Sequence, residues 1–426
     1  MRGMTQLGIS FLRGQPRPLE AIESPYAWMR LGLSLLLMTL GGSGMYAVTV
    51  VLPAIQREFG VDRGAASFPY TLTMVGFGLG GVLMGRLSDR FGVVLPVAIG
   101  AVGLGAGFIA AGLAPQLAGF SVAQGLLIGL LGTSATFAPL VSDTSQWFDR
   151  RRGTALAICM SGNYAAGALW PPVLQHFIDS VGWRQAYIGL GVFCLVTMLP
   201  LAWFLRPRPP VQATPAVTPG AAPAARRDTT HPLGLRPGTA QALLSVAGVA
   251  CCVAMAMPQV HIVAYCTDLG FGPARGAQML SLMLGLGVVS RLVSGWISDR
   301  IGGLRTLLLG SVLQGIALLM FLPFDGLVSL YLVAGLFGLF QGGIVPSYAL
   351  IVRQHFSPAE AGARVGTVLM ATLFGMALGG WMSGAVFDLT GSYRAAFVNG
   401  LAWNALNLGI VLFLLWRLRS RGAVTS

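Results

Sequence analysis

The sequence lacks lysine and contains few charged residues of any kind. Only 10% of its 426 residues are charged, and 27 arginines against 14 acidic residues give a net charge of +13. A soluble globular domain carries about 25% charged residues, so this composition excludes that class. With 55% hydrophobic residues and a mean hydropathy of +0.73, the chain is predicted to be a polytopic membrane protein.

Cysteine and histidine are scarce as well. The five cysteines show no metal-ligand spacing with histidine or acidic residues, so we interpret them as apolar packing residues. We find no paired carboxylates, no nucleophile beside a base and no metal-binding cluster at a common depth in the predicted membrane spans. We therefore expect neither an enzyme nor a bound metal or cofactor.

Long apolar runs recur along the whole chain. A helix needs about 20 apolar residues to cross the hydrocarbon core of a bilayer. The run at 91–142 is twice that length and breaks at Ala114-Pro115-Gln116. The sequence thus predicts twelve spans, at 31–56, 64–85, two within 91–142, 153–178, 185–205, 237–267, 275–298, 304–322, 326–352, 365–387 and 395–416.

The arginines are concentrated on one side of this predicted topology. With the N-terminus inside, 21 arginines and 8 acidic residues fall on the inner side, against 5 arginines and 6 acidic residues outside. This positive-inside bias predicts cytoplasmic termini and a location in the inner or plasma membrane. We attribute the basic charge to topology and to contact with anionic lipids, not to nucleic acid.

An internal repeat divides the chain. The motif GRLSDRFG at 85–92 recurs as GWISDRIG at 295–302, and we call both copies SDR turns; a second match, Asp179 with Asp388, has the same offset of about 210. The Pro- and Ala-rich stretch between the copies is typical of a flexible linker. The predicted parts are a cytoplasmic tail (1–29), a six-helix half (30–205), a cytoplasmic linker (206–238), a second half (239–417) and a tail (418–426).

Together, the twelve spans, the linker and the two SDR turns resemble the major facilitator superfamily over residues 30–416. WFDRRRGTALAICMSGNYAAG at 147–167 and HIVAYCTDLGFG at 261–272 are similar to its branch of monocarboxylate transporters and oxalate/formate antiporters. The resemblance implies an all-α membrane protein of two pseudo-symmetric halves, which move around a substrate near the midplane.

Only one ionised side chain, Arg291, is expected well inside a predicted span; the other charges, including Arg30 at the cytoplasmic entry to the first span, are placed at or beyond the ends of apolar runs. A charge at this depth costs about 2.5–3.5 kcal/mol and indicates a functional site. Asp299 lies eight residues further on, about 12 Å along a helix, so the side chain cannot easily reach the surface. A guanidinium matches a carboxylate with two parallel hydrogen bonds. We predict that Arg291 binds substrate, with a structural role as the alternative; in the resembling branch an arginine at this position binds the substrate carboxylate.

The sequence departs from that branch in ways that bear on substrate charge. Animal monocarboxylate transporters have an aspartate one turn before this arginine and a lysine in the first helix; here the first position is Gly287, and 31–56 carries no charge before Arg57. Oxalate/formate antiporters have a lysine in helix eleven, whereas 365–387 is uncharged. One enclosed cation neutralises one carboxylate, which favours a monoanion over a dicarboxylate.

Other polar residues are weaker predictions. We expect Asn163, Tyr46 and Gln341 to line the substrate cavity, although interhelical hydrogen bonding is the commoner role for each. His261 and Asp268 share one face of a helix and are predicted to couple a proton. The alternatives are a core histidine, an ordinary loop acid, and a proton carried by the substrate itself.

The SDR turns are predicted to gate the pathway. Their carboxylates can meet an arginine or a helix N-terminus and so hold the cytoplasmic side closed in one state. The predicted gating residues are Gly85, Asp89, Arg90, Asp299 and Arg300.

We therefore predict a secondary active transporter that moves a small organic monocarboxylate by alternating access, coupled to a proton. Its expected partners are this anion, a proton and membrane lipids, and it is expected to act as a monomer. The alternatives are a multidrug or other organic-anion efflux or antiport carrier of the same fold, and a transport-inactive membrane sensor.

Overall fold

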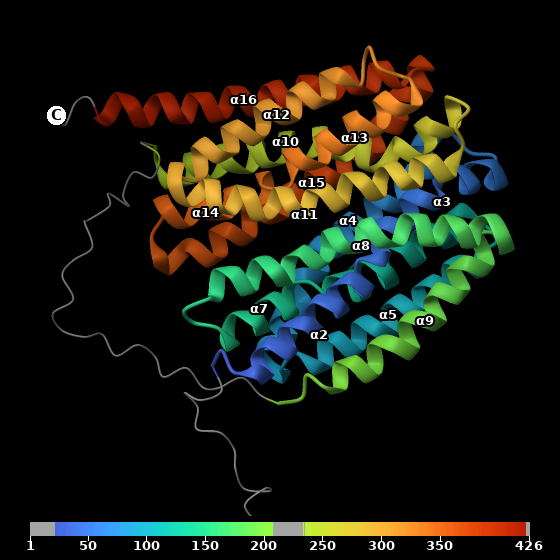
Figure 1. Ribbon diagram of the computed structural model, residues 1–426, viewed down its shortest axis with the longest axis horizontal. Helices are drawn as coiled ribbons and strands as arrows, with labels where there is room; N and C mark the ends of the chain where they lie inside the picture. Colours follow the sequence, from blue (N-terminus) through green and yellow to red (C-terminus); the bar gives the residue numbers. More distant parts are fainter. Residues whose placement is uncertain (1–21, 208–232, 234, 423–426) are drawn as a thin grey trace, which may run out of the picture.

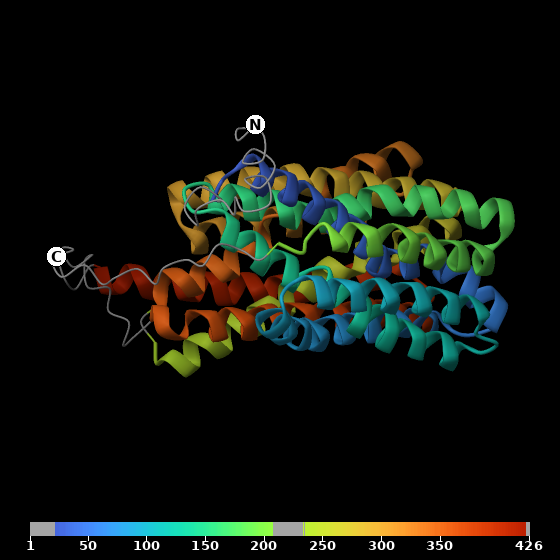
Figure 2. The same cartoon turned by 90° about the horizontal axis from the view of Figure 1, so that it is seen from below.

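The protein is almost entirely helical. A computed structural model describes residues 22–207, 233 and 235–422, and no strand occurs among them, which confirms the predicted all-α class. The helices run side by side along the longest axis (Figures 1 and 2). Their bounds are α2 Pro25–Gly41, α3 Ser43–Phe59, α4 Arg63–Phe91, α5 Val94–Leu113, α6 Leu117–Val122, η1 Ala123–Thr133, α7 Ala138–Trp147, α8 Arg152–Val181, α9 Trp183–Trp203, α10 Pro237–Asp268, α11 Pro273–Ile301, α12 Gly303–Met320, α13 Leu327–Gln341, α14 Ile344–His355, α15 Pro358–Thr390 and α16 Tyr393–Gly422.

Eleven helical segments in the described part of the chain are long and apolar enough to cross a membrane. The 30-residue α8 runs beside them and is less apolar, because Asn163 and two prolines interrupt its apolar residues. With α8, the segments make the twelve spans expected from the sequence. Three spans are divided: the first into α2 and α3, the fourth into α6, η1 and α7, and the tenth into α13 and α14.

The two halves repeat the same backbone geometry. α4 ends at Phe91 and α11 at Ile301, and the glycines that follow, Gly92 and Gly302, have φ of 83° and 82°. Only glycine adopts this conformation readily, so both SDR turns leave their helix in the same direction. In Figure 1 the first-half helices, blue to green, lie below the second-half helices, yellow to red.

Helix ends differ by several residues from the predicted boundaries. The first helix begins at Pro25, five residues before the predicted start of the first half, and Ser24 caps it by accepting a hydrogen bond from the Ala27 amide. The last helix continues to Gly422, into the predicted tail 418–426. Most of the predicted linker 206–238 lies outside the described residues.

A buried ion pair lies within the first half. Arg30 of α2 donates to both carboxylate oxygens of Asp143 in α7, at 2.7 and 2.8 Å, and the side chains are 2% and 4% exposed. The Tyr26 hydroxyl accepts a third hydrogen bond from Arg30, and the Trp147 ring lies beside the guanidinium. Arg291 is therefore not the only enclosed charge, contrary to the expectation from hydropathy, which placed Arg30 at a helix entrance.

Candidate functional site

The interface between the halves is formed mainly by two helix pairs. α4 packs on α15, and α8 packs on α11. Along the second pair, the Ser281 hydroxyl donates to the carbonyl oxygen of Ala168, and a Cβ added at Gly167 would lie 2.2 Å from the Leu284 side chain. Small residues thus let α8 and α11 approach closely, and this contact carries Arg291 to the opposite half.

Arg291 bridges the halves through carbonyl oxygens. Its Nη1 donates to Met160 of α8 at 3.2 Å, and its Nε lies 3.4 Å from the carbonyl oxygen of Gly342, between α13 and α14. The guanidinium carbon lies 4.5 Å from the centre of the Tyr164 ring, a cation–π arrangement. The arginine is half-buried and is held by neutral groups.

No carboxylate balances this charge within the described ranges 22–207 and 235–422. The ion pairs found there join five other arginines to acidic residues, and Arg291 belongs to none of them. An enclosed cation held by carbonyl dipoles retains an unneutralised charge. The arrangement is suited to receiving an anion.

A glycine pair positions the second carbonyl. A Cβ at Gly342 would lie 2.4 Å from the Gly287 carbonyl oxygen, and one at Gly343 would lie 2.0 Å from the Ser294 hydroxyl. These residues separate α13 from α14 and allow the break to press against α11. The Gly342 carbonyl oxygen consequently reaches Arg291.

The other predicted substrate residues lie around this contact. The Tyr46 ring packs on Gly167, and a Cβ at Gly167 would lie 2.9 Å from its Cζ. The Asn163 side-chain oxygen lies beside Gly42, where α2 meets α3. Gln341 directly precedes Gly342; its oxygen accepts a hydrogen bond from Gln259 at 2.9 Å, and its buried Nε2 has no partner among the described residues.

A glycine on α11 makes room for the aromatic partner of Arg291. A Cβ at Gly287 would lie 2.5 Å from two Tyr164 ring carbons. We expect Gly287→Ala to displace this ring and to weaken binding of a carboxylate substrate about tenfold, since the cation–π contact and local packing are worth about 1 kcal/mol or more. The measurement is the half-saturation concentration for uptake into proteoliposomes.

The control for this prediction is Gly295→Ala on the same helix, where an added Cβ meets nothing within 4 Å. It should leave the half-saturation concentration unchanged. Equal values for the parent and Gly287→Ala would show that the Tyr164 position does not matter for binding.

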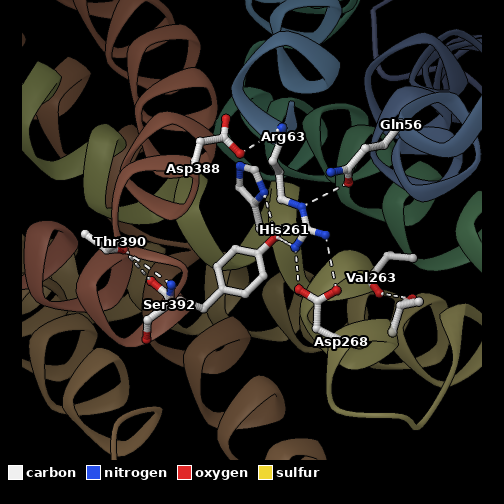
Figure 3. Close-up of polar contacts among 10 residues, drawn as sticks. Gln56, Arg63, His261, Val263, Asp268, Asp388, Thr390 and Ser392 are labelled. Carbon is white, nitrogen blue, oxygen red and sulfur yellow. Dashed lines mark hydrogen bonds and ion pairs between the residues drawn. The ribbon is translucent and has the colours of Figure 1, made fainter. Parts of the chain in front are cut away.

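A second cluster joins the halves at the end where α4 begins. The Arg63 guanidinium pairs with both oxygens of Asp268 on α10, and its Nη1 donates to the Tyr393 hydroxyl of α16 at 2.9 Å (Figure 3). Its Nε donates to the Gln56 side chain at 3.0 Å. The backbone amides of Arg63 and Gly64 donate to Asp388 of α15, at 2.9 and 2.6 Å.

His261 continues this cluster inward. It is fully buried; its Nε2 lies 2.8 Å from the carbonyl oxygen of Gly380 and its Nδ1 lies 3.2 Å from the Tyr393 hydroxyl. Since a carbonyl only accepts, Nε2 carries the proton, and Nδ1 can accept from Tyr393. The neutral imidazole has both nitrogens satisfied, and Asp268 meets it only through Arg63 and Tyr393.

The predicted gating residues lie at the opposite end of the molecule. Asp89, Arg90, Asp299 and Arg300 are exposed, and none of them forms an ion pair in the described chain. Arg90 and Arg300 instead lie over the rings of the adjacent Phe91 and of Trp296. A Cβ added at Gly85 would meet nothing within 4 Å.

Arg63 was not predicted as a functional residue from the sequence. It follows a short polar stretch before an apolar run, which indicates only a helix end. Asp388 stood out in the repeat, but its partner lies 325 residues earlier. Arg63 could have been found by searching for arginines at the start of a predicted span that have an acidic residue of another span at the same predicted depth in the membrane.

Comparison with known proteins identifies relatives across the chain. The family model described as Major Facilitator Superfamily matches residues 34–336 and 242–425. Monocarboxylate transporter 13 of Bos taurus is 27% identical over 330 residues, covering 77% of this chain and 75% of its own. Monocarboxylate transporter 11 of Homo sapiens is 27% identical over 397 residues, covering 90% of this chain and 82% of its own.

Solved structures share the architecture. A bacterial homologue of the human lysosomal transporter Spinster, in an inward-facing and unoccupied conformation, superposes with a TM-score of 0.65 at 15% identity. The match covers 92% of this chain and 95% of that one. At this identity, the similarity shows the fold alone.

Proposed function

Because the chain belongs to the Major Facilitator Superfamily, we propose that it moves a small organic monocarboxylate across the membrane by alternating access. It is a multi-pass membrane transporter similar to monocarboxylate transporters, and it acts on a small molecule. The names of these relatives support a carboxylate substrate, and the residues around Arg291 support it independently.

The observation that carries the proposal is the Arg291 guanidinium without a carboxylate partner in the described residues, held between α8 and α13 by two carbonyl oxygens. A substrate carboxylate would replace neutral acceptors with an ionised one, and such charge-assisted hydrogen bonds are roughly twice as strong. The arginine contacts both halves. A movement of one half relative to the other would therefore change the contacts of an anion bound there.

Charge favours a monoanion. Residues 365–387 of α15 and 31–56 of α2 and α3 contain no ionisable cation that could neutralise a second carboxylate. The apolar and aromatic surroundings of Arg291, including Tyr46 and Tyr164, would leave a second negative charge unpaired. A dicarboxylate is therefore a poor substrate.

We further propose an inner- or plasma-membrane location with cytoplasmic termini, and a monomeric carrier in contact with anionic lipids. The arginine-rich side of the sequence, which includes both SDR turns, supports this orientation. The end with Arg63 and Asp268 then faces outward.

Proton coupling is tested with a pH gradient. In proteoliposomes with a more acidic exterior, we expect accumulation of labelled monocarboxylate by about tenfold per pH unit, the value for one proton per anion. With His261 as the proton carrier, His261→Gln should abolish this accumulation and preserve exchange of labelled for unlabelled substrate.

Two controls complete this experiment. Dissipating the gradient with a protonophore should remove accumulation from the parent, and His176→Gln, a change at another histidine of the chain, should retain it. Accumulation by His261→Gln at the parent level would assign the proton to the substrate. Transport of a drug panel without competition from carboxylates would favour an efflux carrier.

A further inference from the structure

We propose that Arg63 is the outer gate of the transport cycle: with Asp268, Asp388 and Tyr393 it forms a four-residue latch that must break before the site at Arg291 opens outward. The functional meaning of the latch rests on the proposed transport cycle, but its geometry does not.

The latch joins the halves through its side chains. Arg63 is 8% exposed and uses all three guanidinium nitrogens, on Gln56 in its own half and on Asp268 and Tyr393 in the other. Its guanidinium carbon also lies 4.3 Å from the centre of the Phe387 ring. A bidentate pair with a third donor contact fixes the side chain in one orientation.

It also joins them through a helix end. The Asp388 carboxylate accepts from the first two amides of α4, where unpaired N–H groups and the helix dipole favour a negative charge. Gly384, one turn earlier on α15, allows this approach, because a Cβ there would lie 2.9 Å from the Gly64 Cα. One half thus supplies the cap for a helix of the other.

Opposite the latch, the described residues form no comparable contact between the halves. The five ionised side chains of the SDR turns are exposed and form no ion pair in the described ranges. The charged contacts between the halves are therefore concentrated at the outer end. Alternating access requires that the contacts at one end break when those at the other form.

Asp268 belongs to the latch, and His261 remains the residue proposed to carry the coupled proton. Its side chain is 34% exposed and borders a cavity of about 450 Å³, which Gln56, Arg57, Arg63 and Thr267 also line. Solvent therefore reaches this carboxylate while the latch is closed. His261, buried behind Tyr393, has no such exchange route in this state.

Labelling of an introduced cysteine tests the latch without substrate. Ser67, fully buried on α4 one turn from Arg63, donates to the Gly64 carbonyl oxygen, and Ser67→Cys is nearly isosteric. The probe is a maleimide added to purified protein; the five native cysteines are all buried, so the parent measures background. We expect Asp268→Asn or Arg63→Lys to raise the Ser67→Cys labelling rate about tenfold or more, with Arg63→Ala larger still.

The matched control is Glu58→Gln. Glu58 pairs with Arg184 at 2.8 Å, at the same end of the molecule but within the first half, and its loss should not change labelling. Reversing the pair, as Arg63→Asp with Asp268→Arg, should return labelling toward the parent rate. Parent-level labelling in Asp268→Asn and Arg63→Lys, or an equal rise in Glu58→Gln, would overturn the proposal whatever the uptake assays show.

Discussion

Replacing Arg291 with alanine is expected to lower monocarboxylate uptake by about a hundredfold or more. Removing one partner of an enclosed, hydrogen-bonded charge pair costs about 2–5 kcal/mol, and about 2.8 kcal/mol corresponds to a hundredfold change in affinity. Here the remaining partner would be the substrate carboxylate, left beside Tyr164 and carbonyl oxygens that repel it. The measurement is the initial rate of labelled uptake into proteoliposomes at several concentrations.

Two variants separate charge from geometry in this experiment. Arg291→Lys keeps the positive charge but loses the planar fork, so uptake should fall about tenfold. Arg275→Ala removes an exposed arginine from the first turn of the same helix and should leave uptake unchanged. Undiminished uptake by Arg291→Ala, with correctly folded protein, would refute the anion site.

The second large effect concerns stability. Asp143→Asn is expected to lower the free energy of unfolding by about 3–5 kcal/mol, because it leaves Arg30 buried without its counter-charge. Both side chains are almost fully buried, so solvent cannot compensate. The measurement is the thermal unfolding midpoint in detergent, together with the yield of monodisperse protein.

A double replacement distinguishes a need for the pair from a need for neutrality. Arg30→Met with Asp143→Leu should recover most of the lost stability, since well-packed apolar residues often replace a buried ion pair without loss. Glu360→Gln, in the exposed pair with Arg364, should change stability by less than about 1 kcal/mol. An unfolding midpoint in Asp143→Asn equal to that of the parent would show that the pair is dispensable.

The fold was largely predictable because a bilayer leaves few alternatives. In lipid only helices and closed β-barrels satisfy the backbone, and unbroken apolar runs of about 20 residues fit the helix, so these runs give the number of spans. The SDR turns revealed the repeat, and Gly92 and Gly302 show its geometry. Helix breaks such as Gly342-Gly343 were not predicted, because the close approach to α11 that requires them is a tertiary contact.

Sequence reasoning singled out Arg291 but not the ion pairs of Arg30 and Arg63. A charge far from the end of an apolar run is a local signal. Arg30 and Arg63 lie near span ends, where arginine is common, and their partners are 113 and 205 residues away. Ion pairs between residues so far apart produce no repeating pattern in a single sequence. Hydropathy alone therefore indicates only that both arginines set the membrane topology.

The first turns of α4 and α11 show how far the two copies of the repeat have diverged. The offset of 210 residues places Pro273 at the position of Arg63, and Asp179 of α8 at about the position of Asp388. A proline has neither an amide hydrogen nor a cation to offer, and the Asp179 carboxylate accepts from Gln175 of its own helix. Among the described residues, therefore, only one of the two seams between the halves has charged contacts at the end where α4 begins. We therefore expect the two halves to open asymmetrically on the outward side. α4 and α15 would separate, while the contact between α8 and α11 would act as the hinge.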